Sequence, residues 1–385
     1  MKRIFLTLIT ALLAIPASLA CTSAIVAGWA TPDGRPLLWK HRDTSTIDNK
    51  VERIPAKDGA FGYVALFNAN DKRNEQAWIG MNDVGFAVMN TASYNIKDDN
   101  VPNKKMDREG FLMTVALKTC RTVDDFAHLL EKMPRPMGVE ANFGVIDASG
   151  NGAFFETNNH SYKRYDLKDA PDGLLVRTNY SHSGRPNEGY GFVREANAEC
   201  LLAPYAAEHA ITPELLTEKV SRSFYHDLKK RDYALSDEKW VVDQDFIPRY
   251  KSTATIVIEG ARPGLDPSEI VPGQLADEYI MWTGLGYPPC AEIVPVWNKE
   301  GGVADELRGI GVNGHSPMSD KVKARRNEVF GLKRGNKDKY IDMEKLFNAE
   351  GTGYVQVLTK QNHEVYEVFK RKRDGAQRND GTAAM

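Results

Sequence analysis

The sequence predicts an α+β fold in which two antiparallel sheets pack together and helices cover their outer faces, giving a four-layer αββα sandwich. Short runs of apolar and β-branched residues dominate the first part of the chain, and turn signals such as "TPDG" (31–34) and "NDVG" (82–85) separate them. Helical periodicity follows, and then strands, helices and strands again. Whole runs of strands that alternate with runs of helices favour stacked antiparallel layers.

The expected elements follow in chain order. Hairpin strands are expected at 21–30, 35–43, 62–69, 76–81 and 85–93. Helices at 108–120 and 122–133 should follow, and then strands at 141–149, 152–159 and 173–180. The next two helices are expected at 191–210 and 212–228, the second with a Thr212 cap and Pro213 at its first position. Strands at 252–260, 278–286 and 291–297 and a mostly helical tail over about 317–385 complete the pattern.

The first twenty residues are typical of a secretory leader. Lys2 and Arg3 precede the apolar run "IFLTLITALLAI", and the small-residue site "SLA" ends at Ala20. We therefore predict a signal peptide at 1–20 and a mature domain at 21–385, exported to the periplasm or secreted. The apolar run is shorter than the ~20 residues that a membrane helix needs, so no membrane span is expected.

Composition and charge indicate an ordinary globular enzyme. Apolar residues make up 42% and charged residues 26% of the chain, which is near average. The 50 basic and 52 acidic residues become 48 and 52, a net charge of −4, when Lys2 and Arg3 leave with the leader. That balance predicts no nucleic-acid partner. The basic run "FKRKRD" at 369–374 is interpreted as the solvated end of a helix, with a binding patch as the alternative.

The four cysteines do not form the framework of a disulfide-rich protein. Cys21, Cys120, Cys200 and Cys290 are too few for so long a chain, and their spacing leaves any pairing open. No two cysteines, and no cysteine and histidine, stand at the spacing of zinc ligands. We therefore expect no metal site.

Cleavage after Ala20 would make Cys21 the first residue, directly before an apolar strand. A thiol needs a base to become a nucleophile at neutral pH, and a free α-amine, with a pKa of about 7.7–8.0, can be that base. The alternative is a lipoprotein cysteine that tethers the chain to a membrane. Such a site usually has Leu three residues before the cysteine, where this chain has Ser18, and a polar linker after it.

Three segments carry a family resemblance: "CTSAIVAGWATPDGRPLLWKHRD" (21–43), "GMNDVGFAVMNTAS" (80–93) and "LLVRTNYSHSG" (174–184). They resemble the cysteine N-terminal nucleophile hydrolases that cleave linear amides, namely the bile-salt and penicillin V hydrolases, the isopenicillin acyltransferases and, more distantly, the secreted Cys dipeptidases. The resemblance covers most of 21–200 and fades afterwards. It implies the αββα fold, a Cys21 nucleophile and no cofactor.

The resemblance also implies roles around the nucleophile. Asp43 matches the carboxylate that hydrogen-bonds the N-terminal amine. The basic partner of the family lies three residues earlier and is often Arg; here it is Lys40, with Arg42 competing for the role and an exposed strand Lys as the alternative. Strand alternation places Lys40 and Asp43 on opposite faces unless a bulge intervenes.

Donors for the oxyanion are also expected from the resemblance. Asn90 and Asn179 are the candidates, with the backbone amide of Thr91 competing for the place of Asn90 and a turn-holding role as the alternative for Asn179. Arg194 resembles a helix arginine of the family and has a helix-surface position as its alternative.

Several other residues are expected to be structural or to shape the pocket. His41 and His182 should lie at the surface or behind the residues that touch substrate, because an N-terminal cysteine already has its base. Arg249, Trp282 and Tyr287 are candidates for the pocket wall, or for packing alone.

These observations predict an exported hydrolase that cleaves a small-molecule amide through a Cys21 thioester. Two alternatives stay open: an acyltransferase that passes the acyl group to an amine, and a lipid-tethered binding protein without catalysis. Bile-salt conjugates, penicillin-type amides, N-acyl amino acids and short peptides all suit the same chemistry, so the substrate and the oligomeric state are not determined.

Overall fold

The computed structural model describes residues 20–382, and the side chains of residues 20–373. The predicted leader, apart from Ala20, lies outside the described residues. None of the helices in the described part of the chain combines the length and the apolar character needed to cross a membrane.

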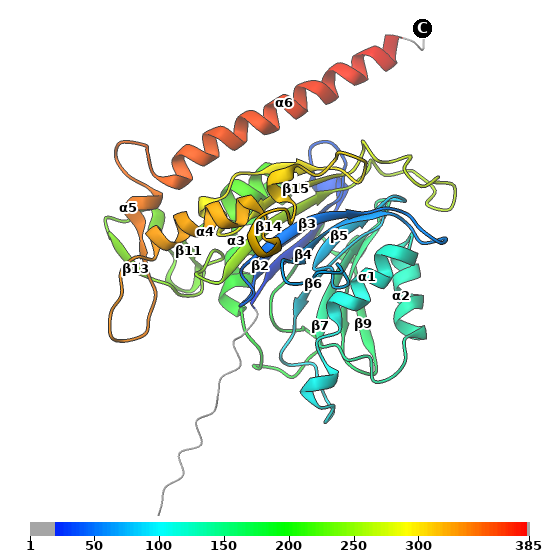
Figure 1. Cartoon of the computed structure of the whole chain (residues 1–385), viewed down its shortest axis with the longest axis horizontal. Helices are drawn as coiled ribbons and strands as arrows, with labels where there is room; N and C mark the ends of the chain where they lie inside the picture. Colours follow the sequence, from blue (N-terminus) through cyan, green and yellow to red (C-terminus); the bar gives the residue numbers. More distant parts are fainter. Residues whose placement is uncertain (1–19, 383–385) are drawn as a thin grey trace, which may run out of the picture.

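The first sheet is six-stranded, with β2 (Leu37–Asp43) and β14 (Ser252–Glu259) at its centre (Figure 1), and the segment after Cys21 forms the strand next to β2. Its strands, in spatial order, are β10 (Leu174–Arg177), β1 (Thr22–Val26), β2, β14, β15 (Ile280–Leu285) and β16 (Val294–Val296). All neighbouring strands are antiparallel. The N-terminal strand β1 is therefore covered on both edges and fully buried.

The second sheet is a seven-stranded antiparallel meander. Its strands are β3 (Asn49–Ile54), β4 (Tyr63–Asn68), β5 (Ile79–Asn82), β6 (Ala87–Ala92), β7 (Ala141–Ile146), β8 (Gly152–Thr157) and β9 (Tyr162–Asp166). The two edge strands, β3 and β9, were not predicted. Their sequences, "NKVERI" and "YKRYD", carry the charged residues that edge strands use against aggregation, and these charges hide the apolar alternation.

Helices cover both outer faces. On the seven-stranded sheet these are α1 (Glu109–Thr119) and α2 (Val123–Lys132), and on the six-stranded sheet α3 (Phe192–Ala207), the π-helical turn η4 (Leu215–Val220) and α6 (Tyr354–Thr382) (Figure 1). A further apolar cluster fills the space between the sheets, with Leu38 of β2 and Met89 of β6 among its members. The predicted four-layer α+β sandwich is confirmed.

The remaining elements are short or lie beside the sheets. They are α4 (Pro317–Val329), α5 (Met343–Leu346) and the two-stranded pairs β11 (Tyr225–His226) with β12 (Arg231–Asp232) and β13 (Trp240–Val242) with β17 (Tyr340–Asp342). The 3₁₀ turns are η1 (Gly28–Ala30), η2 (Asn103–Lys105), η3 (Leu167–Asp169), η5 (Asp227–Lys229), η6 (Tyr233–Leu235), η7 (Pro288–Cys290), η8 (Asp305–Leu307) and η9 (Val312–Gly314).

Two helix predictions were wrong in extent. The helix expected at 212–228 ends at Val220, because Phe224 turns inward and packs against Phe246 and Phe347, at 5.5 and 6.1 Å between ring centroids. The basic run 369–374 lies inside α6 and does not end it. Tertiary packing decided the first boundary, which local periodicity cannot sense.

Candidate active site

Cys21 lies immediately before β1 and is 6% exposed. Its thiol donates to the backbone carbonyl of Asp43, with 3.8 Å between Sγ and the oxygen. Strand β1 pairs with β2 in a register that sets Thr22 opposite His41 and Ser23 opposite Lys40. This register brings the end of β2 alongside the nucleophile.

The residues of β2 alternate between two environments. Lys40 and Arg42 bond to residues of the seven-stranded sheet, whereas Asp43 bonds to Arg249 and Ser252 on the other side. The pairing of β2 with β14 shifts register between Ser252 and Ala254, so the irregularity is in β14 and β2 keeps its alternation. Lys40 and Asp43 therefore lie on opposite faces, as alternation predicts.

The carboxylate of Asp43 is buried and held by three donors. Arg249 donates from Nη2 and Nε to Oδ2, at 2.6 and 3.1 Å, and the Ser252 hydroxyl donates to Oδ1 at 2.6 Å. Nη2 of Arg249 also donates to the backbone carbonyl of Ala20, at 3.4 Å. The carboxylate thus lies beside the Ala20–Cys21 peptide bond.

Lys40 is buried, at 1% exposure, so the alternative of an exposed strand lysine is wrong. Its ammonium donates to Oδ1 of Asn90 at 2.8 Å and to the carbonyl of Trp78 at 2.7 Å. Burial lowers the pKa of Lys40 to about 7; the nearby Cys21 thiol raises this pKa and the Arg42 guanidinium lowers it. The ammonium can therefore lose its proton close to neutral pH.

Arg42 is buried on the same face as Lys40, and its guanidinium donates to the side-chain oxygens of Asn49 and Asn68. Burial lowers its pKa to about 10. Both cations thus have uncharged hydrogen-bond partners, and each interacts electrostatically with Cys21. Of the two, Lys40 is the one that bonds an oxyanion-donor candidate.

The two asparagines are held in different ways. The Lys40 ammonium donates to Oδ1 of Asn90, so the two hydrogens on Nδ2 of Asn90 remain available to donate to another acceptor. Asn179 accepts from Nη2 of Arg194 at 2.8 Å and donates from Nδ2 to the carbonyl of Ala92 at 2.8 Å, which leaves its second amide hydrogen for a further acceptor. Thr91 is fully buried, and its hydroxyl accepts from Asn142.

Arg194 connects the start of β1 to Asn179. Its Nη1 donates to the carbonyl of Cys21 at 2.6 Å and to the hydroxyl of Thr22 at 3.0 Å. At 1% exposure it does not lie on the helix surface, so that alternative is wrong. Burial, and then the neighbouring Arg249, lower its pKa to about 10.

Both histidines bond to groups other than the thiol. His41 is fully buried and hydrogen-bonds the Ser252 hydroxyl at 2.8 Å. His182 pairs with Glu195, with 2.6 Å between Nε2 and Oε1. Among the described residues, the hydrogen bond of the Cys21 thiol goes to the backbone of Asp43 and to neither imidazole.

A cavity of about 220 Å³ adjoins the site. Tyr190 and Phe192 on its wall are 50% and 44% exposed, Phe192 packs on Tyr180 at 4.2 Å between ring centroids, and Tyr190 contacts Tyr94 at 5.5 Å. The cavity is lined by Ala20, Gly189, Tyr190, Gly191, Phe192, Val193, Arg194, Asp245 and Arg249. It therefore combines an aromatic rim with the two arginines next to Cys21.

Of the three pocket-wall candidates, Arg249 lines this cavity and the other two do not. Trp282 packs on Tyr366 of α6, at 4.4 Å between ring centroids, and donates to Glu259. Tyr287 is buried against Phe330. Both are therefore packing residues.

Sequence reasoning missed the pairing of Arg249 with Asp43, and missed Ser252 altogether. Arg249 and Asp43 stand 206 residues apart, and only the pairing of β14 with β2 brings them together. The segment "DFIPRYKST" contains both missed residues, but no spacing rule connects it to Asp43. A charged residue just before an apolar strand was the one available signal.

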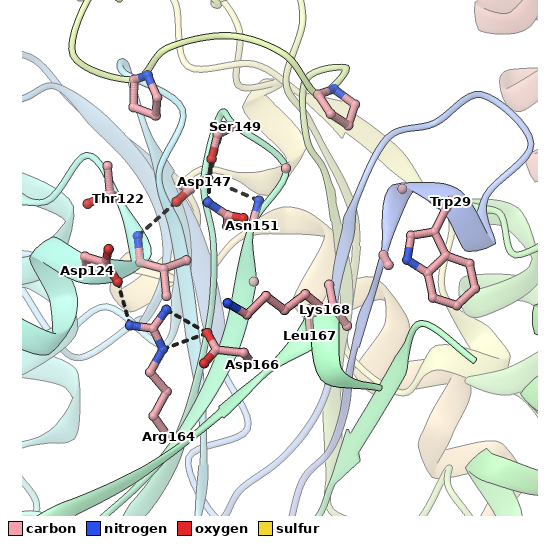
Figure 2. A pocket seen from close by; sticks show the side chains of 17 residues that line it. Trp29, Thr122, Asp124, Asp147, Ser149, Asn151, Arg164, Asp166, Leu167 and Lys168 are labelled. Carbon is pink, nitrogen blue, oxygen red and sulfur yellow. Dashed lines mark hydrogen bonds and ion pairs between the residues drawn. The ribbon is translucent and has the colours of Figure 1, made fainter. Parts of the chain in front are cut away.

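Figure 2 shows a larger cavity, of about 560 Å³. Its lining residues Ala27 and Gly28 follow the end of β1 that is opposite Cys21. On the cavity wall Arg164 bonds Asp124 and Asp166, Asp147 accepts from the turn at Ser149, and Lys168 adds a further charged group. The length of the strand separates it from the thiol by roughly 17 Å. This cavity has no part in chemistry at Cys21.

Within the described residues, metal-ligating side chains gather at Asp48, His315 and Asp320. Lys323 already pairs with Asp48 at 2.7 Å and with Asp320 at 3.5 Å, so a cation of the chain itself occupies that place. The four cysteines are free thiols; Cys200 is exposed and the others are buried.

Comparison with known proteins adds a family match. Residues 62–223 match the family of acyl-coenzyme A:6-aminopenicillanic acid acyl-transferase. This range contains Asn90, Asn179 and Arg194, whereas Cys21 and Asp43 precede it. No curated protein sequence matches the chain significantly.

Several solved structures resemble the fold. An orthologue of N-acylethanolamine-hydrolyzing acid amidase from Caenorhabditis elegans is 14% identical with a TM-score of 0.39, over 66% of this chain and 97% of that one. Conjugated bile acid hydrolase from Clostridium perfringens is 10% identical with a TM-score of 0.42, over 72% and 92%. Penicillin V acylase from Agrobacterium tumefaciens is 11% identical with a TM-score of 0.41, over 72% and 86%.

The αββα layers and the family match over residues 62–223 agree with the class of protein that the sequence resembles, the N-terminal nucleophile amidohydrolases and acyltransferases. The resemblance to the linear-amide branch of that class, which includes the penicillin and bile-salt enzymes, is confirmed.

Proposed function

We propose that this chain is an exported amidase in which Cys21, freed by cleavage after Ala20, attacks the carbonyl of a small-molecule amide. One observation carries the proposal: the Cys21 thiol, the Ala20 carbonyl and the carboxylate of Asp43 meet at the start of β1, where Arg249 bridges the last two. Cleavage there would release an α-amine beside a buried carboxylate. Such an acceptor orients the amine and favours its protonated form.

The reaction proceeds in two halves. The α-amine of Cys21 takes the thiol proton, the sulfur forms a bond to the amide carbon, and the carbonyl electrons move to the oxygen. When the tetrahedral intermediate collapses, the C–N bond breaks and the ammonium returns its proton to the leaving nitrogen. Water then attacks the thioester, giving one proton to the α-amine, and the sulfur leaves and recovers that proton.

The developing oxyanion is stabilised by amide donors. Asn90 offers its Nδ2 hydrogens because Lys40 holds its oxygen, and Asn179 offers its second Nδ2 hydrogen because Arg194 and the Ala92 carbonyl fix the rest of the group. Donors fixed before the reaction stabilise the oxyanion without reorganisation. Lys40 and Arg194 are therefore positioning residues in this mechanism.

The cavity with the aromatic rim is where the substrate binds. At about 220 Å³ it is smaller than the 300–1,000 Å³ of typical ligand sites, but Ala20 forms part of its wall. Removal of the residues up to Ala20 would enlarge it on the side of the nucleophile. Bile-salt conjugates, penicillin-type amides, N-acyl amino acids and short peptides all remain within the proposed substrate class.

The same thioester can pass its acyl group to an amine in place of water, and the family match to an acyl-transferase favours this as the second candidate function. Incubation of the enzyme and an amide substrate with and without hydroxylamine separates the two. A hydrolase yields mainly the free acid, whereas a transferase yields mainly the hydroxamate.

The experiment that tests the proposal is intact-mass analysis of the exported protein together with turnover of the Cys21→Ala variant. We expect a mature chain that begins with an unmodified Cys21, and no turnover in the variant. A diacylglyceryl-modified Cys21 would favour the lipid-tethered binding protein. Wild-type turnover by Cys21→Ala would overturn the nucleophile assignment.

A further inference from the structure

Behind the carboxylate of Asp43, three side chains of β2 and β14 form a buried row of hydrogen bonds. Nε2 of His41 lies 2.8 Å from the Ser252 hydroxyl, and that hydroxyl lies 2.6 Å from Oδ1 of Asp43. The direct distance from Nε2 of His41 to Oδ1 is 3.6 Å. All three residues are at most 1% exposed, so water does not substitute for any of these contacts.

The direction of each hydrogen bond follows from the donors available. The Ser252 hydroxyl has one hydrogen, and the carboxylate of Asp43 can only accept it. The hydroxyl therefore accepts from its other partners, which are the backbone N–H of Arg249 at 2.9 Å and His41. His41 must consequently carry a hydrogen on Nε2.

The charges around His41 favour a neutral imidazole. Burial lowers its pKa to about 4; Asp43 raises this pKa, while the guanidinium groups of Arg249 and Arg194 lower it. With Nε2 protonated, Nδ1 is an acceptor, and it is a buried atom without a hydrogen-bond partner. A buried unsatisfied acceptor costs stability, so an apolar residue would serve packing better at this position.

The two oxygens of Asp43 are held from different sides. Arg249 engages Oδ2 with two hydrogen bonds, but its side chain is 20% exposed and comes from a loop. Oδ1 is held by Ser252 alone among the described residues, and the hydroxyl of Ser252 would be free to rotate without the donors that fill its lone pairs.

We infer that His41 is a positioning residue: through Ser252 it fixes the carboxylate of Asp43 in the orientation that receives the α-amine of Cys21. The inference rests on the function proposed above. His41 donates to Ser252, Ser252 donates to Asp43, and Asp43 accepts from the ammonium that carries the catalytic proton. The three hydrogen-bonded side chains thus connect His41 on β2 to the α-amine of Cys21 at the start of β1. No proton is transferred along them.

A double-mutant cycle tests this inference in the mature, full-length enzyme. His41→Leu and Ser252→Ala should each lower kcat about tenfold with KM nearly unchanged, the effect of one hydrogen bond to a charged group. The double variant should lose no more than either single variant, because both act through the same contact. His41→Gln keeps an N–H donor and should recover most of the lost kcat.

Thr283→Val is the matched control. Thr283 is also fully buried in the six-stranded sheet, on β15, and its hydroxyl donates to the backbone of Met281, away from Asp43. This variant should lose thermal stability and keep its kcat. Equal losses of kcat in Thr283→Val and Ser252→Ala would overturn the inference, as would additive losses from His41→Leu and Ser252→Ala.

A measurement on the unmodified enzyme covers the case in which a variant fails to fold. A long-range ¹H–¹⁵N spectrum should show His41 with its hydrogen on Nε2 and uncharged from pH 5 to 8. A hydrogen on Nδ1, or a charged ring at pH 7, would overturn the inference. Failure of the proposed function is separate, since it would appear as turnover that survives Cys21→Ala.

Discussion

The side chains on the two faces of β2 lie near the same residue, Cys21, but they differ in charge and in hydrogen-bond partners. On the face toward the seven-stranded sheet, Lys40 and Arg42 are buried cations whose hydrogen-bond partners are uncharged oxygens. On the other face, the anion of Asp43 is neutralised by Arg249 and fixed by Ser252. Burial without a counter-charge disfavours the charged form of a cation and lowers its pKa, as it does for Lys40. The first face is therefore the one whose charge should change near neutral pH.

The largest effect is expected from a change to the α-amine of Cys21, which adjoins both faces of β2. A chain that begins Met-Cys21, with the Met retained, turns the α-amine into an amide that cannot accept the thiol proton. Loss of a general base typically costs 10²–10⁴-fold, so kcat should fall at least about a hundredfold with little change in melting temperature. Removal of the Met by an aminopeptidase should restore turnover. Full activity with the extra residue verified by mass would show that another group is the base.

The next effect isolates the Asp43 face. Asp43→Asn keeps the size and one acceptor oxygen, for either Arg249 or Ser252, but removes the charge proposed to hold the α-ammonium. We expect kcat to fall about tenfold to a hundredfold and the pH optimum to shift, with a smaller change in thermal stability. Steady-state kinetics over a range of pH and a thermal melt measure both. An unchanged pH–rate profile would return Asp43 to a purely structural role.

A smaller effect is expected on the Lys40 face. Lys40→Met fills the same space but removes the donor that orients Asn90, and kcat should fall about tenfold at pH 7. Lys40→Arg restores a permanent charge and should recover part of this loss. If both variants keep wild-type kcat, Asn90 is not oriented by Lys40 in the working enzyme.

The lowered pKa of Lys40 also predicts how the stability of the folded protein changes with pH. The folded-state pKa of Lys40 is about 7, against 10.5 for the unfolded chain, so between these values the unfolded state binds more protons. The stability of the wild type should therefore rise with pH relative to Lys40→Met, by at most about 1.4 kcal/mol per pH unit in that window. Urea melts of both proteins at pH 7, 8 and 9 measure the difference. A flat difference would show that Lys40 stays charged.

The smallest effect is expected from a substitution of His182, which is not a residue of β2. Among the described residues, His182 pairs with Glu195, whereas the Cys21 thiol bonds the backbone of Asp43. His182→Gln should leave kcat and its pH profile within about twofold of the wild type, because Gln still donates to the carboxylate. A large loss of kcat would point to His182 as the base, in place of the α-amine that adjoins the two faces of β2.

Sequence reasoning went furthest where local pattern carries the information. The strand that follows Cys21 and the strand that ends at Asp43 were both predicted, and their alternation correctly separated Lys40 from Asp43. It went least far at β3 and β9, whose charged edge sequences hide the period-two pattern, and at 212–228, where the packing of Phe224 ends the helix. Arg249 was expected only at the pocket wall, and Ser252 was not expected in the site.

Periodicity and turn residues are local properties of the chain, and they were enough to predict the αββα layers, the position of Cys21 before a buried strand and the carboxylate at the end of the next strand. The burial of Lys40 and Arg194, the pairing of Arg249 with Asp43 across 206 residues, and the contact of His41 with Asp43 through Ser252 became visible in the folded chain alone. Burial and hydrogen-bond partners depend on which strands pair and in which register. For β2 and β14 that pairing is set by packing across the whole sheet, and no short segment encodes it.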